Sequence, residues 1–201
     1  MKEKDSRYTE YQNNRNNRNR AARAERKAEK ASGRTSTRNL AFLSDILRAW
    51  GFTQASFARA VSTTKQNIGH YFLRDDAPLS AIQRHLAGIR IRLKVSYDGV
   101  SDGQGAHYQI IWDDRALPPL YGQPSLVSLV LDRFNQPSRT TFLARLIVLK
   151  GLPVECFCSY VGLKVSRLRT ILQSDDIRIS EIYRIGKAFG LKISWIAEAI
   201  K

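Results

Sequence analysis

The chain has 201 residues and a formal net charge of +15, enough length for one or two small domains and a basic excess that favours a polyanionic partner over a merely solvated basic surface. Its only cysteines, Cys156 and Cys158, are too few for a disulfide framework or a zinc site, so we expect no metal and a reducing, cytoplasmic location. No apolar run reaches the roughly 18 residues that span a bilayer, and no apolar segment follows the basic N-terminus, so we expect neither membrane insertion nor secretion.

Residues 1–38 are predicted to be a basic, disordered tail, because they contain no aliphatic side chain beyond alanine and Met1 and cannot form a core. Residues 20–31 are rich in Ala, Arg, Glu and Lys, which favours nascent helix. We expect this tail to follow a nucleic-acid backbone, and the alternative is a solubilising tail or a linker. The side chains expected to contact phosphates are Arg15, Arg18, Arg20, Arg23, Arg26 and Lys27.

The apolar spacing of residues 40–50 predicts a helix that buries Leu43, Ile46, Leu47 and Trp50 and ends at Gly51. Residues 51–71 then show two helical patterns that a break at 62–64 separates. Thr53 and Thr64 each precede one of these patterns, and a threonine hydroxyl can accept from the unpaired N–H groups of a first helical turn. We therefore expect two short helices joined by a tight turn.

A further helix is expected over residues 79–89, and the period then changes to two. Apolar residues alternate with polar ones over 91–97, which predicts a half-buried strand. Residues 98–105 are predicted to be a turn-rich loop, and 107–112 the returning strand of a hairpin. The basic outer face of the hairpin suits either phosphate contact or solvation. Residues 114–137 form a proline-containing linker with a short helix, 126–134, which Ser125 caps and which we expect to brace the two halves.

The segment from 138 to 201 repeats the first half at a constant shift of 100 residues. Matching pairs include Phe42 and Phe142, Leu43 and Leu143, Gly51 and Gly151, Phe57 and Phe157, Val61 and Val161, Ser80 and Ser180, Ile82 and Ile182, and Arg84 and Arg184. Because most of the shared residues are those a helical core needs, we interpret the chain as two copies of one fold. The copies are expected to differ at their ends, since residues 191–200 suggest a last helix capped by Ser194.

The first copy resembles the helix-turn-helix of the Cro/C1, or XRE, family of phage repressors. The resemblance is carried by Gly51-Phe52-Thr53-Gln54, Phe57-Ala58, Val61, Thr64 and Ile68, and a more divergent copy follows. It implies a mainly α fold with two tandem lambda-repressor-like helix-turn-helix domains, the first followed by a β-hairpin. These domains would occupy residues 39–113 and 138–201.

The resemblance also implies which side chains contact DNA in the first copy. Gln54 corresponds to a glutamine that bonds a phosphate and braces the recognition helix, and Thr64, Lys65, Gln66, Asn67 and His70 lie on that helix. Lysine can donate to guanine, and glutamine or asparagine can pair bidentately with adenine. The alternative is that these are simply exposed helical residues. Arg74 and Gly69 depart from the family pattern, and a glycine within the helix costs about 1 kcal/mol relative to alanine.

The second copy departs further, because Pro153-Val154 stands where the first copy has Thr53-Gln54. Its candidate contacts are Lys164, Ser166, Arg167, Arg169 and Thr170, and the alternative is a retained scaffold for self-association. Cys158 is expected in its core.

We therefore expect a double-stranded DNA-binding protein, nucleoid-associated and most simply a sequence-specific transcriptional regulator with two recognition helices. His70, His85 and His107 form no catalytic constellation, so we expect neither an enzyme nor a cofactor or small-molecule substrate. Homo-oligomerisation is left open. The alternatives are a non-specific structural or packaging protein and a protein-interaction module such as an antitoxin or co-repressor.

Overall fold

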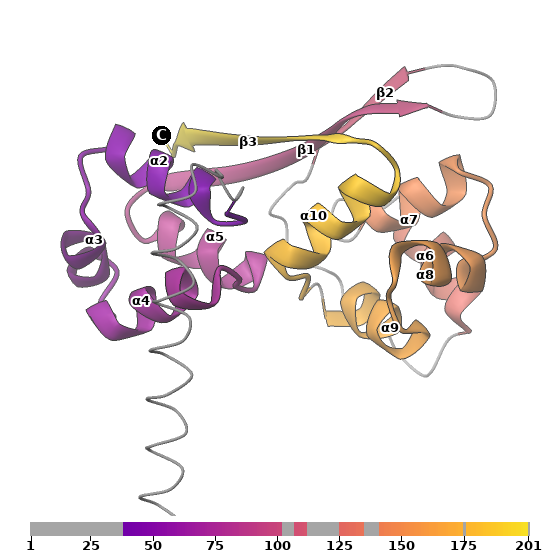
Figure 1. Ribbon diagram of the computed structural model, residues 1–201, viewed down its shortest axis with the longest axis horizontal. Coiled ribbons are helices and arrows are strands. Elements are labelled where there is room, and N and C mark those ends of the chain that lie inside the picture. Colours follow the sequence, from indigo (N-terminus) through magenta and orange to yellow (C-terminus); the bar gives the residue numbers. More distant parts are fainter. Residues whose placement is uncertain (1–37, 102–106, 112–124, 135–140, 175, 201) are drawn as a thin grey trace, which may run out of the picture. The chain divides into compact units, whose positions relative to one another are not determined.

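The computed structural model describes residues 38–101, 107–111, 125–134, 141–174 and 176–200 (Figure 1). These residues are mainly helical, and the contacts join Asn39–Lys201 into one compact unit that contains both predicted copies. The first copy consists of α2 (Ala41–Ala49), α3 (Gln54–Ala60), α4 (Lys65–Arg74), α5 (Leu79–Ala87), β1 (Ile91–Ser101) and β2 (His107–Ile111). Helix α6 (Leu126–Phe134) follows, and then come α7 (Thr141–Leu149), α8 (Val154–Val161), α9 (Val165–Ser174), α10 (Ile179–Ala188) and β3 (Lys192–Ala199).

The four helices of each copy have nearly the same boundaries once the shift of 100 residues is applied. Helices α2 and α7 coincide at both ends, as do α4 and α9, while α8 and α10 are each one residue longer than their counterparts. The same apolar positions are buried, for example Phe57 with Phe157 and Ile68 with Leu168. The sequence repeat therefore corresponds to a repeat of helices and of core positions.

Local signals set the helix ends as predicted. The Thr53 hydroxyl accepts from the Ser56 N–H (3.1 Å), and the Thr64 hydroxyl accepts from the Asn67 N–H (3.1 Å). Gly51 has a φ of +75°, which glycine adopts without the steric cost that a Cβ brings. One detail of the first helix was predicted wrongly, because Trp50 lies beyond the end of α2 and is 40% exposed.

The sheet has the order β2-β1-β3, and all its pairings are antiparallel. The β1–β2 hairpin is confirmed, although β1 runs on to Ser101 through residues that were predicted to be loop, with a register shift between Tyr97 and Val100. Gly99 lies in that irregular stretch with a φ of +83°.

The predicted last helix, 191–200, is wrong, since Lys192–Ala199 forms β3 along the other edge of β1. Ser194 caps no helix, and its hydroxyl donates to Asp98 Oδ2 (2.7 Å). The Trp195 ring stacks on Phe42 of α2, with the ring centroids 3.7 Å apart. A helix at this position would leave the N–H and C=O groups on that edge of β1 without strand partners, so pairing with β1 overrides the local helical pattern.

Helix α6 was expected to brace the two halves, but it packs mainly against α7 and α9 of the second copy. Its expected cap is confirmed, because the Ser128 N–H donates to Ser125 Oγ (3.1 Å). Arg133 of α6 is fully buried and donates from Nε to the Leu172 carbonyl (3.0 Å), which ties the helix to the end of α9.

Candidate nucleic-acid interface

Helices α3 and α4 form a compact pair joined by residues 61–64. Phe57 and Ala58 of α3 and Ile68 of α4 are buried in the shared core. The connection turns sharply at Ser62, which has a left-handed φ of +52°, and the equivalent residue of the second copy is Gly162, with a φ of +67°. The same turn is therefore made twice, and the second copy makes it with the residue that tolerates it better.

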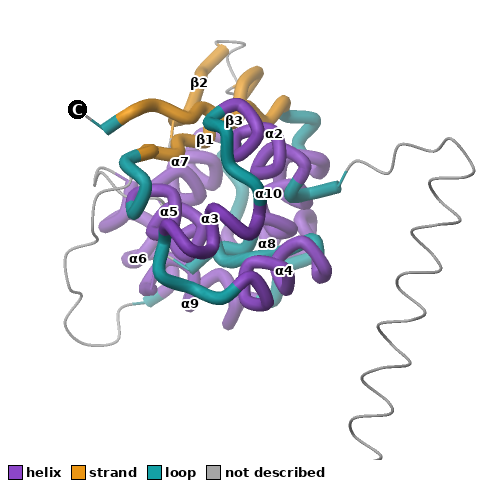
Figure 2. The backbone as a smooth tube through the Cα atoms, turned by 90° about the vertical axis from the view of Figure 1, so that its left-hand side faces the viewer, coloured by secondary structure: helices purple, strands orange, loops and turns teal. Residues whose placement is uncertain are grey.

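The first turn of α4 presents polar side chains to solvent. Thr64, Lys65, Gln66 and Asn67 are all exposed, whereas Ile68, the next residue, is fully buried. Figures 1 and 2 show α4 and α9 on the side of the helices away from the strands, so neither helix is covered by the sheet. The predicted contacts at positions 64–67 thus lie together on one accessible helix end.

The other two predicted contacts of this copy, Gln54 and His70, differ in their exposure to solvent. Gln54 is exposed at the start of α3, and His70 is half-buried one turn along α4. The amide of Asn67 donates to the Thr63 hydroxyl (3.3 Å), which orients this exposed side chain within the first turn. Residues 64–67 are therefore better placed for a large ligand than His70 is.

Gly69 lies within α4, and a Cβ at this position would have no neighbouring heavy atom within 4 Å. We expect Gly69→Ala to raise the free energy of unfolding by about 0.5 to 1 kcal/mol, because alanine restricts the unfolded chain and favours helix. Urea denaturation of the two proteins measures the change. The matched control is Gly51→Ala, which also has open space but a φ of +75°, and it should lower stability instead. Destabilisation by Gly69→Ala would contradict this account of α4.

The equivalent end of α9 presents fewer polar side chains. Lys164 and Ser166 are exposed, and Val165, which replaces Lys65, is 41% exposed. The hydroxyl of Thr170 donates to the Ser166 carbonyl (3.1 Å), and Arg169 is half-buried. The α9 surface thus keeps a positive charge at Lys164 but offers little that can distinguish one base from another.

The side chain of Arg167, a predicted DNA contact, is engaged by residues within the second copy. Its Nε donates to Glu181 Oε1 (2.7 Å) and its Nη2 donates to Glu181 Oε2 (2.8 Å) and to the Asp176 carbonyl (2.8 Å). The Arg167 side chain is 27% exposed and that of Glu181 only 8%. Hydrogen bonding to Glu181 raises the pKa of Arg167 above its ordinary value. The guanidinium is therefore committed to holding α9 against α10.

This ion pair has no counterpart in the first copy. The first copy has Asn67 and Ala81 at the positions of Arg167 and Glu181. Both members of the pair are thus specific to the second copy. Sequence reasoning missed Glu181, although these two differences could have indicated it.

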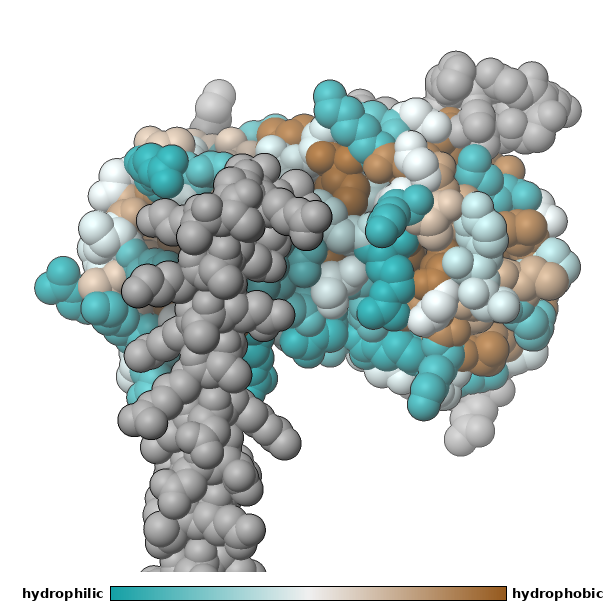
Figure 3. Space-filling model, viewed as in Figure 1, coloured by the Kyte–Doolittle hydropathy of each residue, from teal (hydrophilic) through white to brown (hydrophobic). Residues whose placement is uncertain are grey.

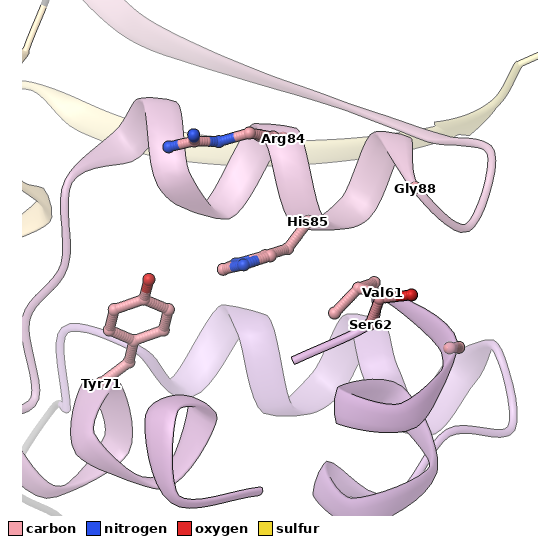
Figure 4. A pocket seen from close by; sticks show the side chains of 7 residues that line it. Val61, Ser62, Tyr71, Arg84, His85 and Gly88 are labelled. Carbon is pink, nitrogen blue, oxygen red and sulfur yellow. The ribbon is translucent and has the colours of Figure 1, made fainter. Parts of the chain in front are cut away.

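A cavity of about 480 Å³ opens between α3, α4 and α5 of the first copy (Figure 4). His85 extends from α5 towards Tyr71 of α4, with the ring centroids 5.9 Å apart. Burial, and then the charge of Arg84, lower the pKa of His85. Both effects favour the neutral imidazole, whose ring packs between α4 and α5.

The predicted tail contacts Arg15, Arg18, Arg20, Arg23, Arg26 and Lys27 lie outside the described residues. Cys156 is exposed and Cys158 is buried, as expected for a core position, and burial raises the pKa of the Cys158 thiol.

Exposed apolar side chains are concentrated on the second copy and on α6. They include Val127, Leu131, Val148, Tyr160 and Val165, and Figure 3 shows brown patches over the second copy. Over the ranges that the structure describes, no His, Cys, Asp or Glu residues gather in a group that could hold a metal, and no helix has the length and apolar character to cross a bilayer. Comparison of the chain with protein-family models, curated proteins and solved structures gave no significant match.

Proposed function

We propose that the protein is a sequence-specific double-stranded DNA-binding protein in which α3–α4 and α8–α9 are helix-turn-helix units. One observation carries this proposal, namely the exposed and capped first turn of α4 with Thr64, Lys65, Gln66 and Asn67 together on it. A helix of this kind fits the major groove, where lysine donates to guanine and the amides pair with adenine. The buried Ile68 anchors the helix beneath these residues.

The net charge supports the second component of binding. A chain with 33 Lys and Arg against 18 Asp and Glu gains affinity for any duplex through release of condensed counterions. We assign this sequence-independent affinity to the basic tail, residues 1–38, and to the exposed Lys164 at the start of α9. Transcriptional regulation is the role that suits a protein with both a specific and a non-specific component.

The two helix-turn-helix units are proposed to have unequal roles. Lys65, Gln66 and Asn67 of the first unit are replaced by Val165, Ser166 and Arg167, and the arginine is engaged by Glu181. The first unit reads the bases, and the second supports it and contacts the backbone.

Gln66→Ala and Lys65→Ala are expected to weaken binding to a selected duplex about 5- to 100-fold each, because a bidentate base contact contributes about 1 to 3 kcal/mol of discrimination. Selection from random DNA supplies the duplex, and fluorescence anisotropy on it and on a scrambled duplex measures the effect. Gln66→Ala should leave the scrambled duplex unaffected, since glutamine carries no charge.

The control variants change the same residue types at exposed positions away from the first turn of α4. Gln173→Ala alters the end of α9, and Lys192→Ala removes one positive charge from β3. Both should retain affinity for the selected duplex. Equal losses in the Lys65 and Lys192 variants, with no loss in the Gln66 variant, would instead support non-specific binding.

The strong positive charge also favours a second candidate, a non-specific packaging protein held on nucleic acid by residues 1–38. Deleting this segment separates the two functions, because Asn39–Lys201 forms a compact unit without it. If the full chain shows no sequence preference and the truncated chain no binding, the packaging function is correct.

A further inference from the structure

The two copies meet through their strands in a register centred on equivalent residues. Val95 of β1 pairs with Trp195 of β3, and these positions differ by the repeat shift of 100. The flanking pairs are reciprocal, because Leu93 pairs with Ala197 while Ile193, the counterpart of Leu93, pairs with Tyr97, the counterpart of Ala197. Antiparallel pairing with this centre relates the strands by an approximate two-fold rotation.

A second contact between the copies has the same symmetry. Pro78 and Arg178, again 100 residues apart, form an antiparallel bridge. The Leu79 N–H donates to the Ile177 carbonyl (2.8 Å), and the Ile179 N–H donates to the Ala77 carbonyl (3.0 Å). Exchanging the copies converts each of these hydrogen bonds into the other. The two-fold axis therefore passes through both the strand pair and this bridge.

A two-fold relation constrains how the recognition helices can approach DNA. Repeats related by translation would present α4 and α9 in the same direction and read a direct repeat. Repeats related by a two-fold rotation present α4 and α9 in opposite directions. The matching DNA site has the same symmetry, which means an inverted pair of half-sites.

The side chains at this interface favour pairing of the first copy with the second copy over pairing of two first copies. Gly186 lies against Tyr97, and a Cβ on Gly186 would be 3.1 Å from the Tyr97 ring and 2.9 Å from Ile193. The counterparts of Gly186 and Tyr97 are Leu86 and Ala197, so the sizes are reversed across the axis. Two first copies paired in the same way would set Leu86 against Tyr97, where even a Cβ is crowded.

The polar contacts between the two copies are also asymmetric. Asp76 of the first copy accepts from Arg178 Nε (2.5 Å) and from the Ser180 N–H (3.0 Å) at the start of α10. The counterpart of Arg178 is Pro78, which has no side-chain donor. A pair of first copies would lack the arginine that Asp76 binds here.

Building on the proposed function, we infer that one chain, acting as an internal two-fold dimer, binds an inverted and unequal pair of DNA half-sites. The half-site beneath α4 is the specified one, and the half-site beneath α9 is held through the backbone. The half-sites lie about one helical turn, or about 10 base pairs, apart from centre to centre.

Orientation is tested by giving α9 the reading residues of α4 in the full-length chain. The substitutions are Lys164→Thr, Val165→Lys, Ser166→Gln and Arg167→Asn, with Glu181→Ala to remove the carboxylate that Arg167 binds. Three duplexes carry the half-site selected by the wild-type chain once, twice inverted or twice direct, at spacings around 10 base pairs. The grafted variant should prefer the inverted duplex over the direct one by about tenfold or more.

The matched control carries only Arg167→Asn and Glu181→Ala, which remove the ion pair without adding base contacts, and it should not gain this preference. A grafted variant that binds the direct duplex as well as the inverted one overturns the inference while the proposed function stands. An absence of sequence preference in the wild-type selection removes the proposed function itself.

A second measurement uses the wild-type chain and does not depend on how the grafted variant folds. Hydroxyl-radical footprinting of the selected duplex should give protection related by a dyad between the half-sites, and native mass spectrometry should find one chain per duplex. Protection related by translation, or two chains on one inverted site, overturns the inference.

Discussion

Tyr97→Ala is expected to lower the free energy of unfolding by about 3 to 5 kcal/mol, the cost of deleting a large aromatic side chain from a packed core. Tyr97 is 1% exposed, and its ring lies 4.2 Å from that of Phe142 in α7, centroid to centre. Its hydroxyl donates to the Ile182 carbonyl of α10. One residue of the first copy therefore fills the core of the second, and urea denaturation of the full chain measures the loss.

Two control variants separate the contributions of Tyr97. Tyr97→Phe removes only the hydroxyl and should cost about 0.5 to 1.5 kcal/mol, the net value of one hydrogen bond. Tyr160→Ala makes the same truncation at a side chain that is 62% exposed, and should cost less than about 1 kcal/mol. A Tyr97→Ala variant as stable as the Tyr160→Ala variant would contradict the interface between the copies.

Arg167→Ala is expected to lower the free energy of unfolding by about 2 to 3 kcal/mol, because it leaves the buried Glu181 carboxylate without its guanidinium partner. This loss is smaller than that for a fully buried pair, since 27% of the Arg167 side chain is exposed to solvent. DNA binding by the folded variant should change less than it does in Gln66→Ala. Denaturation and anisotropy on the same preparation measure both effects.

A double-mutant cycle tests this role of the ion pair. Arg167→Ala with Glu181→Ala should be more stable than Arg167→Ala alone, because no uncompensated charge remains. Strictly additive losses would show that the two side chains do not depend on each other. A large loss of DNA affinity with unchanged stability would instead indicate that Arg167 contacts DNA.

Short-range features of the fold could be predicted because they depend on neighbouring residues. The caps at Thr53 and Thr64 and the turn at Gly51 need only local chemistry, and the buried faces of α2 and α5 follow from apolar spacing. Strand β3 could not be predicted in this way. Its pairing partner β1 is about 100 residues away in the sequence. The local pattern of residues 191–200 is as consistent with a helix as with a strand.

The candidate site was predictable in part for the same reason. The exposure of residues 64–67 follows from the helical face that Ile68 buries. The ion pair of Arg167 depends on Glu181, which lies on another helix, so the position of Arg167 on α9 could not reveal this contact. The two-fold relation was also beyond the sequence, because a shift of 100 residues is compatible with either translation or rotation of the copies.

The pairing of β1 with β3 joins two parts of the same polypeptide. In a homodimer the equivalent interface would dissociate on dilution, whereas the effective concentration of one copy for the other is set here by their connection. Thermal unfolding should therefore be independent of protein concentration, and titration of a duplex should follow a simple hyperbola. Such a protein would occupy its site at copy numbers too low to keep separate subunits associated.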